Sequence, residues 1–376
     1  MRLLCDENLW GGAVLLAGLG ELRFRPGREI GPADVAHADV LLLRSQTRID
    51  AALLGTARPR FVGTATAGTE HVDRALLEAR GVPFANAPGS NAEPVADWVM
   101  AVVADAALAG RLRLPGARCA VIGCGEVGGR VARRLAALGC EVLCVDPPRR
   151  ARGLPLPGRE VSLAEALAAD LVTLHVPLTS AAPYATRDLL DAAAVASLRP
   201  GTVLLNAARG GVLDDAALLT RLRDRGDLHV ALDVYAQEPA PSLELLERCR
   251  FATPHVAGHS IDGKLRGTLM VRDALCETLG LTVTTTAEAA LPAPVAPARS
   301  VPDRRSALAF AVRARGLRED SAAFREALAS GEEARAAFDR LRRDYGPYRD
   351  FTAQRVRATG EAAPLLRALG FAVVEV

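Results

Sequence analysis

The sequence is poor in aromatic residues, has no excess of charge of either sign and contains no cysteine pair with metal-binding spacing. Aromatic residues make up 4% of the 376 residues, and none of the seven cysteines forms a C-x-x-C pair. An odd number of cysteines without such pairs argues against a disulfide framework and against a zinc site. The 46 basic residues nearly balance the 44 acidic ones, so the sequence indicates no face for binding nucleic acid.

Long apolar runs are also missing. No apolar stretch approaches the roughly 20 residues that a transmembrane helix needs. The first five residues lead directly into Asp6-Glu7-Asn8, which is not the pattern of a signal peptide. We therefore expect a cytoplasmic protein that holds no metal and whose partners include neither a membrane nor nucleic acid.

The most informative stretch of the chain is residues 118–146. An apolar run at 119–122 is typical of a strand buried on both faces, and Gly123, Gly125 and Gly128 follow it with the spacing G-x-G-x-x-G. In this pattern the first glycine permits a tight turn, the second lets a pyrophosphate approach the backbone, and the third lets the helix pack closely on the strand. The following helix directs free N–H groups and the positive end of its dipole at the phosphates.

A second apolar run at 142–145 ends at Asp146, about 20 residues after the glycines. A carboxylate at this place accepts hydrogen bonds from the ribose hydroxyls of a dinucleotide and repels a 2′-phosphate. The pattern therefore predicts binding of NAD rather than NADP. A lone G-x-G-x-x-G is weak evidence, but here the strand, the helix, the second strand and the acid all fall in place.

The length of the chain indicates two or three domains. Strand-like runs and helical patterns alternate in the first part of the chain, which favours a parallel sheet covered by helices. The expected strands lie at 1–5, 39–43, 61–64 and 82–85, and the clearest helix at 70–80 has Thr69 as its N-cap. A helix at 91–109 then crosses to a second lobe.

The second lobe continues the same alternation and predicts a doubly wound fold with a crevice at the strand ends. Its expected strands lie at 171–176, 202–205 and 229–234, and its helices at 189–198 and 214–223. A helix at 261–279 returns to the first lobe. The predicted divisions are 1–92 with 257–285 as a substrate lobe, 93–256 as a nucleotide domain, 286–299 as a linker and 300–376 as an association domain.

Polar side chains follow four of the predicted strands in the first lobe, at 6–8, 44–47, 64–69 and 86–91. Ligands of open α/β sheets bind at the carboxyl ends of the strands, so these residues are candidates for one polar pocket. Small hydroxyl and amide residues in loops commonly satisfy turns instead. The two interpretations are about equally supported by the sequence.

Three residues after consecutive strands of the second lobe form a chemically complete set: Arg209, Glu238 and His255. Oxidation of a secondary alcohol needs a base for the hydroxyl proton, and a histidine serves near neutral pH. A carboxylate beside the ring stabilises the imidazolium and fixes its tautomer. The planar fork of an arginine binds the carboxylate of a 2-hydroxy acid in a bidentate manner.

Each of the three also has a plain structural explanation, as a surface charge, a turn residue before Pro239 and a loop histidine respectively. Their joint position downstream of a dinucleotide motif favours catalysis. The remaining histidines have less clear positions: His37, His71, His175, His229 and His259.

Over about residues 1–280 the chain resembles the D-isomer-specific 2-hydroxy acid dehydrogenases. The resemblance rests on the glycine motif with Asp146, on His175-x-Pro177-Leu178, Asn206-x-x-Arg209-Gly210, Asp233-Val234, Glu238-Pro239 and Thr253-Pro254-His255. It implies an α/β fold of two doubly wound parallel-sheet lobes, a Rossmann NAD domain and a flavodoxin-like substrate domain, followed here by a small α+β C-terminal dimerisation domain. The NAD contacts expected from motif and resemblance are Gly123, Gly125, Glu126, Val127, Gly128, Asp146, His175, Ala207, Ala208, Asp233 and Gly258.

Within this family, several stretches are similar to a branch that oxidises 4-phospho-D-erythronate with NAD and acts as a homodimer in pyridoxal 5′-phosphate synthesis. These stretches are 6–8, 44–45, 61–69, 146–148, 263–268 and 342–345. The similarity implies Ser45 and Thr66 as substrate contacts, and Arg44 is a further candidate. The branch has a substrate-contacting tyrosine where this chain has His259, so an imidazole would have to make that contact.

Two other functions stay open at this point. Another D-2-hydroxy acid, such as 3-phosphoglycerate or hydroxypyruvate/glyoxylate, is a substrate of the same class, although a regulatory βαββαβ module does not fit the pattern after residue 300. A non-catalytic regulator that senses NAD is the less favoured alternative.

Overall fold

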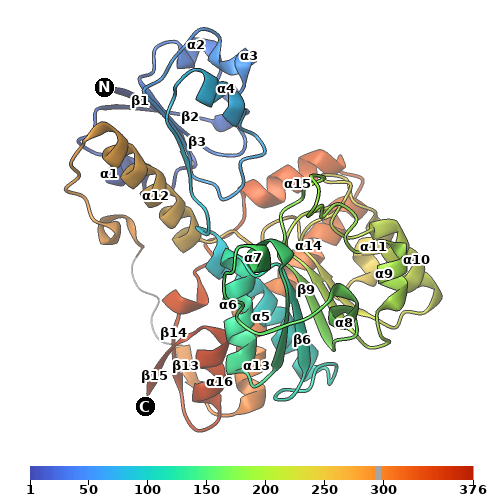
Figure 1. Ribbon diagram of the computed structural model, residues 1–376. Coiled ribbons are helices and arrows are strands. Elements are labelled where there is room, and N and C mark those ends of the chain that lie inside the picture. Colours follow the sequence, from blue (N-terminus) through green and yellow to red (C-terminus); the bar gives the residue numbers. More distant parts are fainter. Residues whose placement is uncertain (293–297, 376) are drawn as a thin grey trace. The chain divides into compact units, whose positions relative to one another are not determined.

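The computed structural model describes residues 1–292 and 298–375, which divide into two compact units (Figure 1). The first unit comprises Met1–Asn91 and His259–Pro294, and the second comprises Ala92–Gly258 and Val295–Val376. Part of the predicted linker, 293–297, lies outside the described residues. Among the described residues, no helix is both long and apolar enough to cross a membrane.

The first unit is built on a five-stranded parallel sheet of order β2-β1-β3-β4-β5. This is the strand order of flavodoxin-like folds, which confirms the fold expected for this lobe. The strands are β1 (Arg2–Asp6), β2 (Glu21–Arg25), β3 (Val40–Leu43), β4 (Phe61–Thr64) and β5 (Phe84–Asn86). The helical segments are α1 (Gly12–Leu15), η1 (Gly27–Glu29), α2 (Pro32–Val35), α3 (Ala51–Leu54), α4 (Arg74–Ala79), α12 (Ile261–Leu279) and η2 (Ala287–Ala290).

Both faces of this sheet are covered, because successive side chains of a strand point to opposite faces. In β3, Val40 and Leu42 pack with Val271 of α12, whereas Leu41 and Leu43 lie in the core on the opposite face. The continuous apolar run of β3 is therefore that of a strand buried on both faces.

The second unit contains a seven-stranded parallel sheet of order β12-β11-β10-β9-β6-β7-β8. The order reverses between β6 and β9, which is the switch point of a Rossmann fold, where ligands bind. The strands are β6 (Arg118–Ile122), β7 (Glu141–Val145), β8 (Arg159–Glu160), β9 (Leu171–Leu174), β10 (Val203–Asn206), β11 (His229–Leu232) and β12 (Phe251–Ala252). The helices are α5 (Ala92–Leu108), α6 (Glu126–Ala137), α7 (Pro147–Ala151), α8 (Leu163–Leu167), α9 (Ala192–Ser197), α10 (Asp215–Asp224) and α11 (Leu243–Arg248).

Two helices begin later than the sequence predicts. Thr69 does not cap α4, because the carboxylate of Asp73 accepts the cap hydrogen bond from the backbone N–H of Leu76 at 2.9 Å, and Val72 pairs with Ile49 as an isolated bridge. The expected helix at 189–198 starts at Ala192, because Leu190 pairs with Leu213. The short strands β2, β8 and β12 were not predicted.

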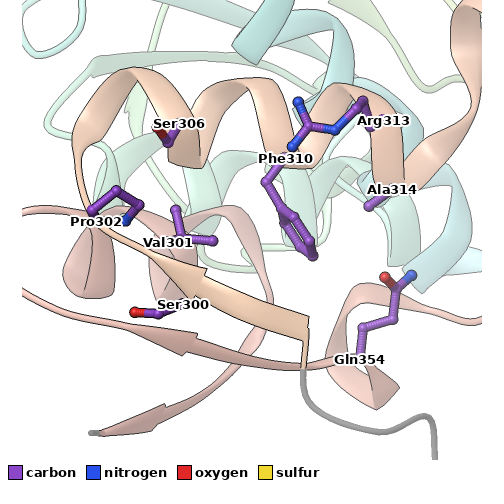
Figure 2. Close-up of a pocket in the computed structure, with 8 residues that line it drawn as sticks. All are labelled: Ser300, Val301, Pro302, Ser306, Phe310, Arg313, Ala314 and Gln354. Atoms are coloured by element: carbon purple, nitrogen blue, oxygen red, sulfur yellow. The ribbon is translucent and has the colours of Figure 1, made fainter.

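The C-terminal segment folds onto the second unit. It comprises β13 (Ala298–Val301), α13 (Arg304–Arg315), α14 (Leu317–Ala329), α15 (Ala334–Arg343), η3 (Phe351–Ala353), β14 (Arg355–Ala358), α16 (Ala362–Leu369) and β15 (Ala372–Glu375). Its three strands form a parallel sheet, and Leu308 and Leu366 share one hydrophobic core with Val99 of α5. Beside β13, Phe310 and Arg313 of α13 and Gln354 line a pocket (Figure 2).

A buried carboxylate ties this segment to α5. Asp97 is fully buried and accepts hydrogen bonds from Arg134 Nη1 at 2.6 Å, Tyr348 Oη at 2.9 Å and the backbone N–H of Phe351 at 2.8 Å. Burial raises the pKa of Asp97 to about 6, against the opposing charge of Arg134. Three donors therefore share one buried carboxylate, and Arg134 also donates to Glu93 through Nη2 at 2.6 Å.

Replacement of Asp97 by alanine should lower the free energy of unfolding by about 3–5 kcal/mol, because it leaves the Tyr348 hydroxyl and the Phe351 N–H without their acceptor and removes one of the two carboxylates that pair with Arg134. Denaturation by urea, followed by circular dichroism, measures the loss. A matched control is Asp191→Ala, which removes only the N-cap of α9 and should cost about 1 kcal/mol. A loss for Asp97→Ala no larger than that of the control would contradict this account.

Candidate active site

The glycine motif has the geometry that a dinucleotide needs. Gly123 directly follows β6 and has a φ of +87°, and a Cβ there would lie 2.7 Å from the carbonyl oxygen of His175. A Cβ on Gly128 would lie 1.8 Å from the carbonyl oxygen of Gly123, so neither position accepts a side chain. Gly125, at the N-terminus of α6, has no atom within 4 Å of its ideal Cβ position. Open space at a helix N-terminus fits a pyrophosphate.

Asp146 follows β7 and is held by the backbone. One carboxylate oxygen accepts from the N–H of Cys124 at 2.8 Å, and the other accepts from the N–H of Arg149 at 2.9 Å, which caps α7. A carboxylate has about four acceptor positions, so this fixed group can still accept from ribose hydroxyls. The residues present therefore fit the adenosine half of NAD.

His175 follows β9, beside the glycine turn at the switch point. Its Nε2 lies 2.9 Å from the hydroxyl of Thr173, and its Nδ1 is buried without a hydrogen-bond partner in the described structure. Burial lowers the pKa of His175 to about 3, so the ring is neutral at physiological pH. A neutral ring with a free polar atom here is compatible with the predicted cofactor contact.

Two of the three predicted catalytic residues are in direct contact. Nδ1 of His255, after β12, lies 2.9 Å from Oε2 of Glu238, which follows β11. Oε1 of Glu238 accepts from the backbone N–H of Tyr235 at 3.0 Å. Burial alone would raise the pKa of Glu238, but the hydrogen bond and charge of His255 outweigh it and the pKa is lowered. The ionised carboxylate therefore engages Nδ1 and leaves Nε2 available to a substrate.

The turn that carries His255 is strained and is held by a buried acid. His255 has a φ of +56°, a conformation that costs a non-glycine residue about 1–3 kcal/mol. Asp233 accepts from the hydroxyl of Thr253 at 2.6 Å and from the backbone N–H groups of Val256 at 2.8 Å and Ala257 at 3.0 Å. Burial raises the pKa of Asp233 to about 6, and the charge of His255 opposes the shift. Both oxygens of Asp233 thus fix this turn, and its direct contact with NAD stays a prediction.

Arg209 follows β10 at the same edge of the sheet, because β10, β11 and β12 are parallel neighbours. Its Nη1 donates to the carbonyl of Ala208 at 2.8 Å. A Cβ on Gly210 would lie 1.8 Å from the carbonyl oxygen of Tyr235, so the loop of Arg209 packs directly on the loop of Glu238.

Three of the predicted cofactor contacts lie in or beside these loops. Ala207 and Ala208 lie in the loop of Arg209, and Gly258 follows the turn that carries His255.

The first unit holds the predicted substrate contacts at its own sheet edge. Arg44 and the exposed Ser45 follow β3, Thr66 follows β4, and His259 precedes α12.

Several polar side chains at this edge form hydrogen bonds within the loops themselves. The hydroxyl of Thr66 donates to the carbonyl of Gly68 at 2.8 Å. The hydroxyls of Thr64 and Thr66 lie 2.9 Å apart, and Asn86 Nδ2 donates to the carbonyl of Ala67 at 2.9 Å. The structure supports the turn interpretation for these groups without deciding the substrate contacts.

The structure adds residues to which the sequence assigned no role. Asp215 accepts from the backbone N–H of Ala236 at 2.8 Å, and burial raises its pKa to about 6 with smaller contributions from Asp214 and Glu238.

In the first unit, burial and the neighbouring charge of Arg44 lower the pKa of Lys264. A signal for Lys264 exists in the sequence, since a cation in the first turn of a helix opposes the helix dipole. No group of three or more possible metal ligands occurs among the described residues.

Comparison with known proteins shows which proteins share this architecture. Residues 93–257 match the D-isomer specific 2-hydroxyacid dehydrogenase, NAD binding domain. Among solved structures, a protein from Thermus thermophilus is 28% identical with a TM-score of 0.62 and covers 76% of this chain and 99% of its own. An NAD⁺-bound 3-phosphoglycerate dehydrogenase from Entamoeba histolytica shares the fold at 21% identity with a TM-score of 0.62, over 76% of this chain and 97% of its own.

Relatives that match over the whole length are erythronate-4-phosphate dehydrogenases. The protein from Azotobacter vinelandii is 43% identical over 98% of this chain and 99% of its own length. The one from Pseudomonas aeruginosa is 42% identical over 100% of both chains. The chain therefore belongs to the D-isomer-specific 2-hydroxyacid dehydrogenase family and, within it, to the erythronate-4-phosphate dehydrogenases.

Proposed function

We propose that this protein oxidises 4-phospho-D-erythronate to 2-oxo-3-hydroxy-4-phosphobutanoate with NAD⁺, a step toward pyridoxal 5′-phosphate. The observation that carries the proposal is the 2.9 Å contact between His255 and Glu238 in the unit that holds the NAD motif. Full-length relatives with this activity in their names support the choice of substrate.

The cofactor would be held by the glycine turn, the N-terminus of α6 and Asp146. When bound, NAD⁺ supplies the acceptor for the hydride that leaves C2 of the substrate. The remaining cofactor contacts from the sequence stay part of this proposal: His175, Ala207, Ala208, Asp233 and Gly258.

The chain's own residues then handle a proton and a carboxylate. Nε2 of His255 takes the proton of the C2 hydroxyl as the carbonyl forms, and Glu238 stabilises the resulting imidazolium through Nδ1. The guanidinium of Arg209 orients the substrate carboxylate and polarises the C2 oxygen. Catalysis by this set is acid–base chemistry combined with bidentate positioning.

The first unit supplies the contacts for the rest of the substrate. Arg44 and Lys264 are neighbouring cations there, and like charges at close range favour an anionic ligand such as a phosphate. Ser45 would donate a hydroxyl hydrogen bond, and Thr66, whose own proton goes to the carbonyl of Gly68, would accept one from a substrate hydroxyl. His259 would replace the tyrosine of the branch with an imidazole donor.

Self-association is the proposed further role of the C-terminal segment, with a homodimer in the cytoplasm as the expected state. The edge strand β13 and the neighbouring pocket wall at Phe310 support this use (Figure 2). Light scattering on the purified 39.5 kDa chain tests it, since a dimer gives twice this mass and a monomer would refute the proposal.

Another 2-hydroxy acid is the alternative substrate. A regulatory βαββαβ module would have favoured 3-phosphoglycerate, but the described C-terminal strands are three parallel strands separated by helices. A non-catalytic regulator that senses NAD is disfavoured, because NAD binding alone does not require a strained histidine paired with a carboxylate.

Purified protein with NAD⁺ should form NADH on addition of 4-phosphoerythronate, and much more slowly with 3-phosphoglycerate or with glycerate. His255→Ala should lower kcat by about 10²–10⁴-fold, the usual contribution of a positioned acid–base group. Absorbance of NADH measures both effects. Faster turnover of another acid would change the substrate assignment, and near wild-type turnover by His255→Ala would exclude its role as the base.

The activity of Glu238→Gln should report the contact between Glu238 and the imidazole. Burial opposes ionisation of Glu238, but the hydrogen bond and charge of His255 lower its pKa, so the carboxylate is ionised and stabilises the imidazolium that forms during oxidation. The neutral amide of glutamine cannot stabilise that charge, so Glu238→Gln should lower kcat by about tenfold or more, measured by the absorbance of NADH.

A matched control is Asp215→Asn, which removes a nearby carboxyl that accepts from the Ala236 N–H rather than from the ring. It should keep kcat within about twofold of wild type. Wild-type kcat in Glu238→Gln, or an equal loss in both variants, would show that the 2.9 Å contact does not support the base.

A further inference from the structure

Arg315, the last residue of α13, carries a fully buried charge in the C-terminal segment. Its side chain is 0% exposed, and its Nη2 donates to the carbonyls of Val256 at 3.0 Å and Ala257 at 3.3 Å. These two residues directly follow His255. The buried guanidinium therefore lies against the turn that carries the proposed base.

Other groups hold Arg315 in place. Its Nη1 donates to the hydroxyl of Tyr345, which donates in turn to Asp320 Oδ2 at 2.8 Å. The ring of Tyr348 lies 4.4 Å from the guanidinium carbon, within the range of a cation–π contact. A buried cation needs several such partners, because its removal from water costs several kcal/mol.

The same turn is thus held through every backbone polar group of two consecutive residues. Asp233 accepts the N–H groups of Val256 and Ala257, and Arg315 donates to their carbonyls. One nitrogen, Nη2, donates to both carbonyls while Nη1 donates to the hydroxyl of Tyr345, and the single ammonium of a lysine cannot reproduce this planar set of contacts. Because His255 has a φ of +56°, the turn would relax if these restraints were lost.

A second contact joins the segment to the strand before the turn. The hydroxyl of Ser321, in α14, is buried and accepts from the backbone N–H of Ala252 at 3.1 Å. Ala252 is the last residue of β12. The C-terminal helices therefore hold both the end of β12 and the turn that follows it.

We infer that Arg315 is a positioning residue for the proposed reaction, and that the C-terminal segment sets the geometry of the imidazole of His255 in addition to any role in association. The inference rests on the proposed function, in which His255 is the base. The guanidinium acts through the turn and has no contact with the reacting atoms.

The test compares two arginines of the full-length chain that make the same kind of contact in different places. Arg325 donates to the carbonyls of Leu246 at 2.9 Å and Cys249 at 2.7 Å, at the end of α11. Arg315→Lys and Arg325→Lys each replace a fork by a point charge. Thermal unfolding, kcat, KM for both substrates and the dissociation constant of NAD are measured for each variant.

Arg315→Lys should lower kcat by about 10–100-fold, the size expected when a catalytic group is displaced by about 1 Å. NAD affinity should fall much less than kcat, because the glycine motif and Asp146 are not involved and only the proposed contacts Asp233 and Gly258 adjoin the turn. Arg325→Lys should keep kcat within about twofold. Equal kcat in the two variants would overturn the inference. So would a loss of NAD affinity parallel to the loss of kcat, since that indicates general damage.

Tyr345→Phe keeps the test decisive if Arg315→Lys does not fold. It deletes the hydroxyl that links Arg315 to Asp320 and should lower kcat by about threefold or more, without an effect on NAD affinity. Wild-type kcat in a folded Tyr345→Phe would then count against the inference.

Failure of the proposed function has a different signature, namely a wild-type protein that turns over no 2-hydroxy acid. Hydrogen exchange at the amides of Val256 and Ala257 reports the turn without turnover. Exchange should be faster in Arg315→Lys or in Tyr345→Phe and unchanged in Arg325→Lys. Unchanged exchange in all variants would overturn the positioning role whatever the substrate.

Discussion

The hydrogen bonds that fix the turn at residues 253–257 are the constraint on which the site depends. His255 occupies a left-handed conformation, and the carboxylate of Asp233 offsets the cost of that conformation by accepting three hydrogen bonds from the turn. The indole of Trp98 donates to the hydroxyl of Thr253 at 3.1 Å, which links the turn to α5. With the backbone fixed, Nδ1 of the imidazole contacts Glu238, and Nε2 remains available to a substrate.

Parallel strands explain why residues far apart in the sequence reach one edge. The loops after β10, β11 and β12 carry Arg209, Glu238 and His255, and their carboxyl ends lie side by side in the second sheet. This rule and the strand–turn–helix pattern around Gly123 depend on local sequence. For that reason the fold class, the NAD domain and the contact between His255 and Glu238 could be predicted before the structure was known.

The features that could not be predicted depend on contacts between distant parts of the chain. Thr69 is a good N-cap by type, but the pairing of Val72 with Ile49 delays α4 until Asp73. Arg315 lies among scattered arginines that are usually solvated, and only the packing of α13 against the second unit buries its charge. The substrate contacts in the first unit stay predictions, because hydroxyl groups such as that of Thr66 serve a loop and a ligand equally well.

The most direct test of this account is a crystal structure of the protein with NAD and 4-phosphoerythronate. The account predicts Nε2 of His255 within about 2.6–3.2 Å of the C2 oxygen, with Nδ1 still on Glu238 and the guanidinium of Arg209 on the substrate carboxylate. An imidazole turned away from the C2 oxygen, or a substrate carboxylate bound without Arg209, would contradict it.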